Sequence, residues 1–222
     1  MTKHLHRELD KIKKRVLSLG ALAEERVHMT AEAIHNRDAA ISQKIIDSDW
    51  EIDEMEVEVE EECLKILALY QPVAVDLRFL VATIKINNDL ERIGDEAVNI
   101  SERVVTMSKR PDPGFVFDYS LMVEQAQSML KMSLDSLVNL DVDLAFKVIT
   151  LDDSVDAIQK EAYDQIKTAI KEKPDRVGYL INLLLISRHL ERLADHCTNI
   201  AEEVIYLIEG EIIRHSKFDS NE

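Results

Sequence analysis

Four pairs of acidic residues, each spaced four positions apart, are the residues of this sequence best suited to chemistry. They are Asp49 with Asp53, Glu91 with Asp95, Asp152 with Asp156, and Glu191 with Asp195. Positions four apart on a helix lie on one face, about one turn from each other. Carboxylate oxygens gathered in this way are the ligands that magnesium, manganese, calcium and ferric iron prefer, and zinc also accepts them. The pairs therefore predict metal binding.

One such pair by itself carries little information, because 43 of the 222 residues are acidic. About eight pairs with this spacing arise by chance in a chain of this composition. Solvation, or ion pairing with neighbours such as Arg92 and Arg192, is therefore the alternative interpretation. The run from Glu54 to Glu62 places glutamates on several helix faces, which is typical of a solvated surface.

The positions of the pairs along the chain are more informative than their spacing. The first two pairs lie at equal distances from Pro72, and the last two lie at equal distances from the Lys173-Pro174 junction. In an antiparallel helical hairpin, equal distances from the turn place both pairs at the same height. We therefore predict two clusters of four carboxylates, in which like charges raise one another's pKa unless a cation neutralises them.

The helices that would position these clusters are repeated. LERIGD at 90–95 returns as LERLAD at 190–195, a shift of 100 positions, and residues 36, 38, 49 and 53 match residues 139, 141, 152 and 156 at a shift of 103. The hydrophobic periodicity predicts helices near 4–35, 38–70, 73–109, 115–139, 142–172 and 175–210. Short loops make neighbours in sequence antiparallel. We therefore predict an all-α fold of two tandem three-helix bundles, residues 1–110 and 111–222, joined by a linker at 109–115.

Composition restricts the class of partner and the compartment. The net charge of −16 argues against nucleic acid and against an anionic membrane surface. The longest apolar run is too short to span a bilayer, and the N-terminus has no secretory segment. We therefore expect a cytoplasmic protein without membrane insertion, in which Cys63 and Cys197 are reduced core residues.

Other motifs are weaker. Glu25-x-x-His28 and Glu32-x-x-His35 are similar to the ligands of di-iron helical bundles, but both lie on the first helix and the fourth helix has no equivalent. We interpret them as surface residues.

His196, next to Asp195, is an auxiliary ligand candidate only. Trp50, Met122, Met129 and Met132 are expected in the core or at an interface.

No P-loop, nucleophile elbow or nucleophile–base pair is present, so we expect no enzymatic activity.

Two stretches carry a resemblance to a known family. QPVAVDLR at 71–78, followed by LERIGD at 90–95, resembles the PhoU family of bacterial phosphate-signalling regulators, and LERLADH at 190–196 is similar to its second repeat. The second copy departs from the pattern, with KPDR at 173–176. The resemblance covers essentially the whole chain and includes the duplication.

The resemblance implies a non-enzymatic regulator that represses the phosphate-starvation response. It implies an adaptor between the ATPase subunit of the phosphate ABC transporter and a sensor histidine kinase. Some family members carry multinuclear iron or zinc clusters on paired acidic motifs, which here fall on the eight residues named above. Magnesium and manganese are also candidates. We further expect a homodimer, and partner contacts at Asp76 and Arg78 beside the first hairpin loop.

Two other classes of function remain open at this stage. One is a carboxylate-bridged metal store or oxidase, and the other is a structural helical protein that binds partners without metal.

Overall fold

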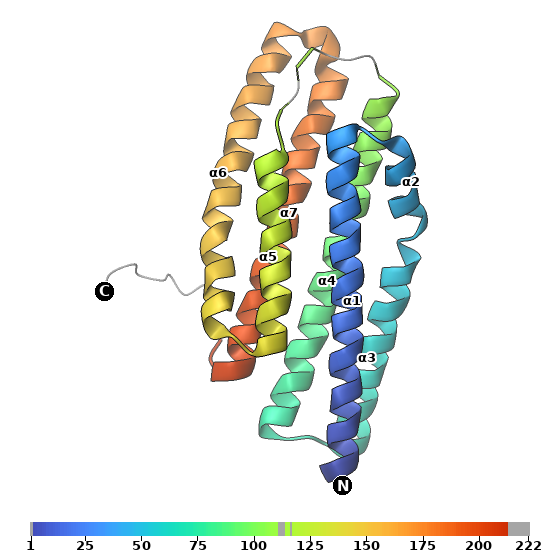
Figure 1. Cartoon of the computed structure of the whole chain (residues 1–222), viewed down its shortest axis with the longest axis vertical. Coiled ribbons are helices and arrows are strands. Elements are labelled where there is room, and N and C mark those ends of the chain that lie inside the picture. The colour runs from blue at the N-terminus through green and yellow to red at the C-terminus, as the bar shows by residue number, and fades with distance from the viewer. Residues whose placement is uncertain (1, 111–113, 116, 213–222) are drawn as a thin grey trace, which may run out of the picture.

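The computed structural model describes residues 2–110, 114–115 and 117–212, and all regular secondary structure within them is helical (Figure 1). The elements are α1 (Thr2–Asn36), α2 (Ala39–Asp47), α3 (Trp50–Tyr70), α4 (Ala74–Ser108), α5 (Ser120–Asn139), α6 (Val142–Glu172), the 3-10 helix η1 (Pro174–Arg176) and α7 (Val177–Glu209). In the first bundle α1 and α4 pack with α2 and α3, and in the second α5, α6 and α7 pack together. The predicted all-α fold of two three-helix bundles is confirmed.

The helix predicted over 38–70 is divided in two at Ser48 and Asp49. The Ser48 amide donates to the Ile45 carbonyl, three residues back, while the Ser48 hydroxyl donates to the Lys44 carbonyl at 2.7 Å. A serine bond of this kind slightly destabilises a helix, but Ser101 makes the same bond within the continuous α4, so the hydroxyl alone does not account for the break. The break ends α2 and lets α3 begin afresh, whereas the equivalent α6 is continuous.

The fifth predicted element also begins later than expected, at Ser120 rather than near 115. Here Asp118 Oδ1 accepts a hydrogen bond from the Ser120 amide at 2.9 Å, which fixes the chain before the first turn. The predicted linker at 109–115 and the predicted domain boundary between residues 110 and 111 lie partly outside the described residues. That boundary stays a prediction.

The repeated residues near 36 and 139 form a turn rather than a binding site. Arg37 and Leu140 both have a positive φ, 52° and 53°, and each is followed by an aspartate that caps the next helix. Asp38 Oδ1 accepts from the amides of Ala40 and Ile41, and Asp141 Oδ1 accepts from the Leu144 amide at 3.0 Å. Side-chain capping satisfies amides that a helix start leaves without a partner, so this part of the repeat is structural.

The two bundles are joined through α4 and α7, which run antiparallel through the middle of the molecule (Figure 1). Buried apolar residues of both bundles belong to one continuous core. The predicted core stripe of α4 is buried from Ala82 to Val104, with Phe79 partly buried at its edge. The separate bundles expected from the sequence therefore share a core.

The burial of single residues tests several expectations from the sequence. It confirms that the two cysteines and two of the methionines lie in the core, and it excludes Trp50 from the core. Cys63 and Cys197 are free thiols with no exposed surface, and burial raises the pKa of Cys63 to about 12. Met122 and Met129 are fully buried. Trp50, in contrast, is 59% exposed, which excludes the core and leaves an interface as its expected place.

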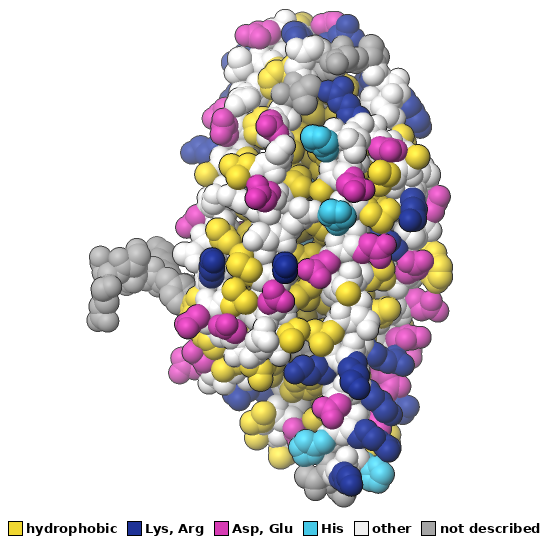
Figure 2. All heavy atoms as spheres, viewed as in Figure 1, with side chains coloured by type: hydrophobic (Ala, Val, Ile, Leu, Met, Phe, Trp, Pro, Cys, Tyr) yellow, Lys and Arg dark blue, Asp and Glu magenta, His cyan; other side chains and the backbone are white. Residues whose placement is uncertain are grey.

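The surface is strongly acidic over much of its area. Figure 2 shows acidic side chains spread along the molecule, with Lys and Arg gathered toward the end that carries the N-terminus. Within the described residues, no helix combines the length and hydropathy needed to cross a membrane.

Candidate metal centre

The first acidic cluster lies where α3 begins beside the middle of α4. The break at Ser48 places Asp49 at the N-cap of α3, and Asp53 follows one turn later. Asp49 makes no side-chain cap hydrogen bond, in contrast to Asp38, so its carboxylate is not used by its own helix. The turn at 71–73 then returns the chain along α4, which brings Glu91 and Asp95 alongside.

Electrostatics shows that these four carboxylates are near one another. Burial, followed by the charges of Asp53 and Asp95, raises the pKa of Asp49 from 3.8 to about 6. Burial and the charge of Asp95, with smaller contributions from Asp53 and Glu56, raise the pKa of Glu91 from 4.5 to about 7. Burial is the largest cause of both shifts and the charges of the neighbouring acids add to it, so the charged form of these carboxyl groups is disfavoured.

Arg92 is the nearest cation, and it neutralises the cluster only in part. Its Nη1 donates to Asp95 Oδ2 at 2.7 Å, and its Nε lies 3.2 Å from Glu91 Oε2. That contact is within ion-pair distance but lacks hydrogen-bond geometry, so the buried Glu91 Oε2 accepts no hydrogen bond. Arg92 does not offset the burial and the neighbouring charges, since the pKa of Glu91 stays raised, and the first cluster therefore fits a bound cation.

The second cluster lies at the corresponding place between α6 and α7. Burial, followed by the charges of Asp195 and Asp156, raises the pKa of Asp152 to about 6. Burial and the charges of Glu191 and Asp156 likewise raise the pKa of Asp195 to about 6. The pKa of Glu191 is also raised, through burial and then Asp156 and Asp152.

The second cluster contains its own unsatisfied oxygen, since the buried Asp152 Oδ1 accepts no hydrogen bond. Arg188 and Arg192 lower the pKa of Glu191, and His196 and Arg192 lower that of Asp195, so some positive charge is at hand. The Nδ1 atom of His196, however, lies 2.9 Å from Asp89 Oδ1 on α4. That nitrogen is therefore directed away from the cluster.

The side chains of the two clusters are not closed around a common centre. Among the described residues, no three His, Cys, Asp or Glu side chains are arranged to hold a metal ion. The helices thus bring each set of four acids close enough to influence one another's pKa without grouping three of them around one point.

Two residues near the first cluster were missed by sequence reasoning. Glu56 contributes to the raised pKa of Glu91, and its position one turn after Asp53 was a signal that could have identified it. Arg26 comes from α1, is 4% exposed, pairs with Glu51 and lowers the pKa of Asp49. No local pattern marks Arg26, because only the packing of α1 on α3 brings it there.

Beside each cluster, two facing residues differ in size between the two copies, and the two size differences cancel. Gly94 lies directly against Ile52, and a Cβ at Gly94 would stand 2.8 Å from Ile52 Cδ1. The matching residues in the second copy are Ala194 and Val155, both with no exposed surface. Ala194 has one carbon more than Gly94, and Val155 has one carbon fewer than Ile52, so the two pairs fill similar volumes. The spacing of the two helices at the acids is therefore under tight steric control.

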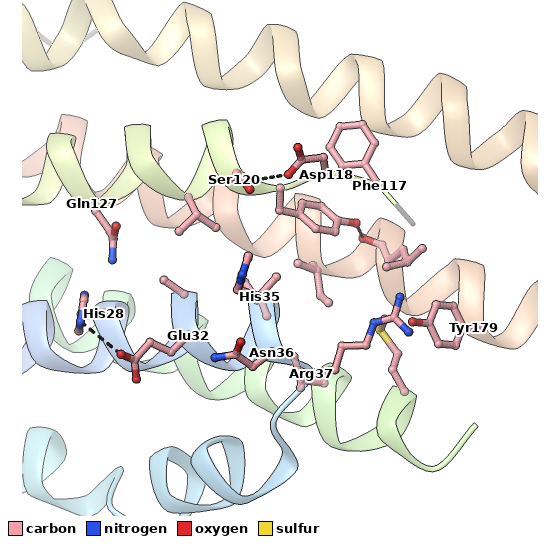
Figure 3. Close-up of a pocket in the computed structure, with 18 residues that line it drawn as sticks. His28, Glu32, His35, Asn36, Arg37, Phe117, Asp118, Ser120, Gln127 and Tyr179 are labelled. Carbon is pink, nitrogen blue, oxygen red and sulfur yellow. Dashed lines mark hydrogen bonds and ion pairs between the residues drawn. The ribbon is translucent and has the colours of Figure 1, made fainter. Parts of the chain in front are cut away.

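A separate cavity of about 570 Å³ lies between the bundles, and it contains the weaker Glu-x-x-His motif (Figure 3). His28, Glu32 and His35 line it from α1, opposite Ser120 and Gln127 of α5. His28 Nε2 is 3.7 Å from Glu32 Oε1, and both side chains are largely exposed. No second Glu-x-x-His pair lines the cavity. His28, Glu32 and His35 are exposed, so these three side chains are surface groups at a crevice, as expected.

Asp76 and Arg78 lie in the first turns of α4, along a groove of about 550 Å³ that also includes Val75 and Phe79. The Arg78 guanidinium lies against Gly210, at the C-terminal end of α7, where backbone carbonyls carry partial negative charge. Exposed apolar residues surround this end of the bundle, among them Leu69, Val73, Val75 and Leu77.

Comparison with known proteins agrees with this architecture. The sequence profile of the PhoU domain matches twice, at residues 16–104 and 119–204. The "Phosphate-specific transport system accessory protein PhoU homolog" of Pseudomonas aeruginosa is 34% identical over 97% of this chain and 89% of its own length. The homologue of the same name from Aquifex aeolicus is 37% identical, over 95% of this chain and 96% of its own.

Solved structures agree with this result. The crystal structure of PhoU from Pseudomonas aeruginosa superimposes with a TM-score of 0.90 at 34% identity, covering 93% of this chain and 99% of that one. The structure of the phosphate transport system regulatory protein PhoU from Streptococcus pneumoniae gives a TM-score of 0.85 at 27% identity, covering 94% of this chain and 98% of that one. With two matched domains, close relatives and the same fold, the chain belongs to the PhoU family.

Proposed function

We propose that this protein is an accessory regulator of phosphate transport that acts as a metal-dependent adaptor. In this role it links the ATPase subunit of a phosphate ABC transporter to a sensor histidine kinase and represses the phosphate-starvation response. The role is non-catalytic and cytoplasmic, and a homodimer is the proposed assembly. Support comes from family membership and from relatives named as accessory proteins of phosphate-specific transport.

The observation that carries the metal-dependent part is the grouping, in each cluster, of buried carboxylates whose pKa is raised. Burial first, and then neighbouring acids, raise the pKa of Glu91 and Asp152, and the buried Glu91 Oε2 and Asp152 Oδ1 accept no hydrogen bond. Asp49, Asp53, Glu91 and Asp95 would hold metal in the first bundle, and Asp152, Asp156, Glu191 and Asp195 in the second. When bound, iron, zinc, magnesium or manganese would supply the positive charge that these acids lack.

Neutralising the clusters would change the surface that partners contact. Repulsion among the acids opposes close packing of α3 on α4 and of α6 on α7, because like charges within a few ångströms destabilise each other. Asp76 and Arg78, beside an exposed apolar rim, are the proposed contact with one partner. The charge state of the clusters would then govern how rigidly these helices hold the surface that partners contact.

The test is co-purification of this protein with the transporter ATPase and with the sensor kinase, with and without added metal. We expect wild-type association with both partners to strengthen when metal is added. Association of the variant Glu91→Gln/Asp95→Asn/Glu191→Gln/Asp195→Asn should no longer respond to metal, because its uncharged amides do not retain the ion. The control is Glu161→Gln/Asp164→Asn, which neutralises two exposed acids of α6 outside the clusters, half as many as the test variant neutralises. Absence of association in every condition would refute the adaptor.

The alternative, a carboxylate-bridged metal store or oxidase, requires histidine ligands beside the acids. The Glu-x-x-His residues of α1 lie at the crevice between the bundles instead. Turnover of ferrous iron with oxygen by the purified protein would nevertheless establish that alternative, and a null assay would remove it.

A further inference from the structure

The outer face of α3 has an apolar stripe that no element of the described ranges covers. Trp50, Val57 and Leu64 are spaced seven residues apart, and they are 59%, 50% and 52% exposed. Residues seven apart on a helix lie within about 20° of one line. α3 packs on α1 and α4 and forms the edge of the first bundle, so this face points to solvent (Figure 1).

The internal repeat shows that the fold does not require this stripe. The buried positions of α3, Ile52, Val59, Cys63 and Ile66, match buried positions of α6 at a shift of 103: Val155, Ala162, Ile166 and Ala169. At the same shift, the three stripe residues correspond to Asp153, Lys160 and Lys167, all exposed. A helix in the same structural position is thus polar on its outer face. The apolar stripe is a property of the first copy alone.

The charges around the stripe indicate what could cover it. Glu54 and Glu61 lie between the apolar residues on the same line, and Glu60 flanks it, all exposed. On the other flank Glu58 is neutralised by Arg15 at 3.0 Å. Within the described part of the chain, Glu54, Glu60 and Glu61 have no ion-pair partner. The stripe is therefore an apolar seam with an excess of negative charge along it.

From this pattern we propose that the outer face of α3 docks a basic amphipathic helix of a partner protein. Such a helix has apolar residues that recur in heptads, with Lys or Arg at the flanking positions, and it would pair with this face as in a two-stranded coiled coil. A second copy of this chain fits poorly, because the acids of one α3 would meet those of the other. The proposal does not depend on the acidic clusters or on phosphate transport, since none of the three apolar residues belongs to either cluster.

Trp50 is the only tryptophan in the chain, so the surface contains its own spectroscopic probe. The test uses the full-length protein and a tryptophan-free helical peptide with leucine at heptad positions a and d and lysine at e and g. We expect the peptide to shift Trp50 emission to shorter wavelength and to protect it from acrylamide quenching. The same peptide with glutamate in place of lysine should leave the emission unchanged.

Two variants retain Trp50 and separate apolar docking from general attraction. Val57→Gln/Leu64→Gln removes apolar contacts without changing charge and should weaken binding by about tenfold or more. Its control is Leu121→Gln/Val138→Gln on α5, where two exposed apolar residues occur outside the stripe. Glu54→Lys/Glu61→Lys should transfer the preference to the glutamate peptide. Unchanged unfolding midpoints would show that each variant is folded.

Three results would overturn the proposal. Equal binding of the lysine peptide to Val57→Gln/Leu64→Gln and wild type would mean nonspecific attraction to an acidic protein. Equal response to both peptides would remove the role of charge. A shift of Trp50 emission with protein concentration alone would identify a second copy as the occupant. Each of these results would leave the proposed adaptor function to be tested separately with the transporter ATPase and the kinase.

Discussion

Asp89 Oδ1 on α4 and His196 Nδ1 on α7 lie 2.9 Å apart across the boundary between the two bundles. A second pair, Glu96 Oε2 and His189 Nδ1, lies 2.6 Å apart at the same boundary. Adding 100 to residue 89 gives 189, and adding 100 to residue 96 gives 196. The internal repeat therefore relates the two pairs by an approximate twofold axis between antiparallel helices.

The chemistry of these pairs shows that the two copies are complementary rather than equivalent. α4 has acids at both positions, and α7 has histidines at the matching positions. Acids at these positions on both helices would place two carboxylates against each other at each site, which is unfavourable. The same α4–α7 boundary contains Lys85 and the buried Glu203, 3.1 Å apart. Polar pairs thus specify which helix joins the bundles and in which register.

We predict that Glu96→Gln destabilises the whole chain. Glu96 is 2% exposed and interacts with His189 and with Arg192 Nη1 at 3.1 Å, partners that hold its pKa below the ordinary value. Loss of charge-assisted hydrogen bonds should lower the free energy of unfolding by about 1–3 kcal/mol. Chemical denaturation measures this. Glu102→Gln, at a surface ion pair with Arg103, is the control and should change stability by no more than about 0.5 kcal/mol. Equal effects of the two substitutions would contradict the assignment of Glu96 to the boundary.

We predict that the two acidic clusters lose metal independently. Glu91→Gln/Asp95→Asn should remove the metal of the first bundle and Glu191→Gln/Asp195→Asn that of the second, each reducing total content by about half. Elemental analysis of protein purified without chelator or affinity tag is the measurement. Glu161→Gln/Asp164→Asn should retain full content. Wild-type metal content in both cluster variants would show that the clusters are not the binding sites.

We predict that the metal-free protein becomes less stable as pH rises from about 4 to about 7. The pKa is raised to about 6 for Asp49, Asp152 and Asp195, and to about 7 for Glu91. Over that window the folded protein retains protons that the unfolded chain has released, so the free energy of unfolding decreases with pH. Below the ordinary carboxyl pKa both states are protonated, and the penalty disappears.

The measurement is urea denaturation at several pH values in the presence of chelator. Asp49→Asn/Glu91→Gln should flatten the pH dependence relative to wild type, since uncharged amides remove the repulsion. Added metal should flatten it as well. A wild-type curve whose slope is unchanged by the substitution would mean that these acids do not carry the effect.

We predict that Gly94 and Ile52 are energetically coupled. Gly94→Ala should clash with Ile52 Cδ1, and overpacking of roughly 1–3 kcal/mol exceeds the gain of about 1 kcal/mol from removing a helical glycine. Ile52→Val alone should cost about 0.5–1.5 kcal/mol. The double variant reproduces the Val155 and Ala194 pair of the second copy, and it should be more stable than the sum of the single effects by about 1–2 kcal/mol. Additive effects in this double-mutant cycle would refute steric complementarity at the first cluster.

Local pattern was sufficient to predict much of the fold. The range predicted for α6 agrees with the structure, and α1, α4 and α7 differ by a few residues at their ends. An apolar stripe with helical spacing over some thirty residues predicts one long helix, because the stripe is buried only if the helix continues. The break at Ser48 was missed because Ile45 and Ile52, both buried, keep the helical spacing across it.

The grouping of the eight acids was also accessible from the sequence. Short turns at 71–73 and near 174 force antiparallel hairpins, so equal distances from the turn become equal heights in space. The proximity of the acids within each cluster is visible in the raised pKa values of Asp49, Glu91, Asp152 and Asp195, to which neighbouring acids contribute after burial. Metal binding by these residues stays a prediction.

The sequence by itself determined what depends on neighbours along the chain: the helices, the hairpins, the duplication and the register of the acidic pairs. Only the tertiary structure decided the contact of α4 with α7, the placement of Arg26 beside Asp49, and the exposure of Trp50. Each of these depends on helices distant in sequence. A helix presents more than one face with enough apolar surface to be buried, and the choice among them is made by the summed packing of the whole molecule.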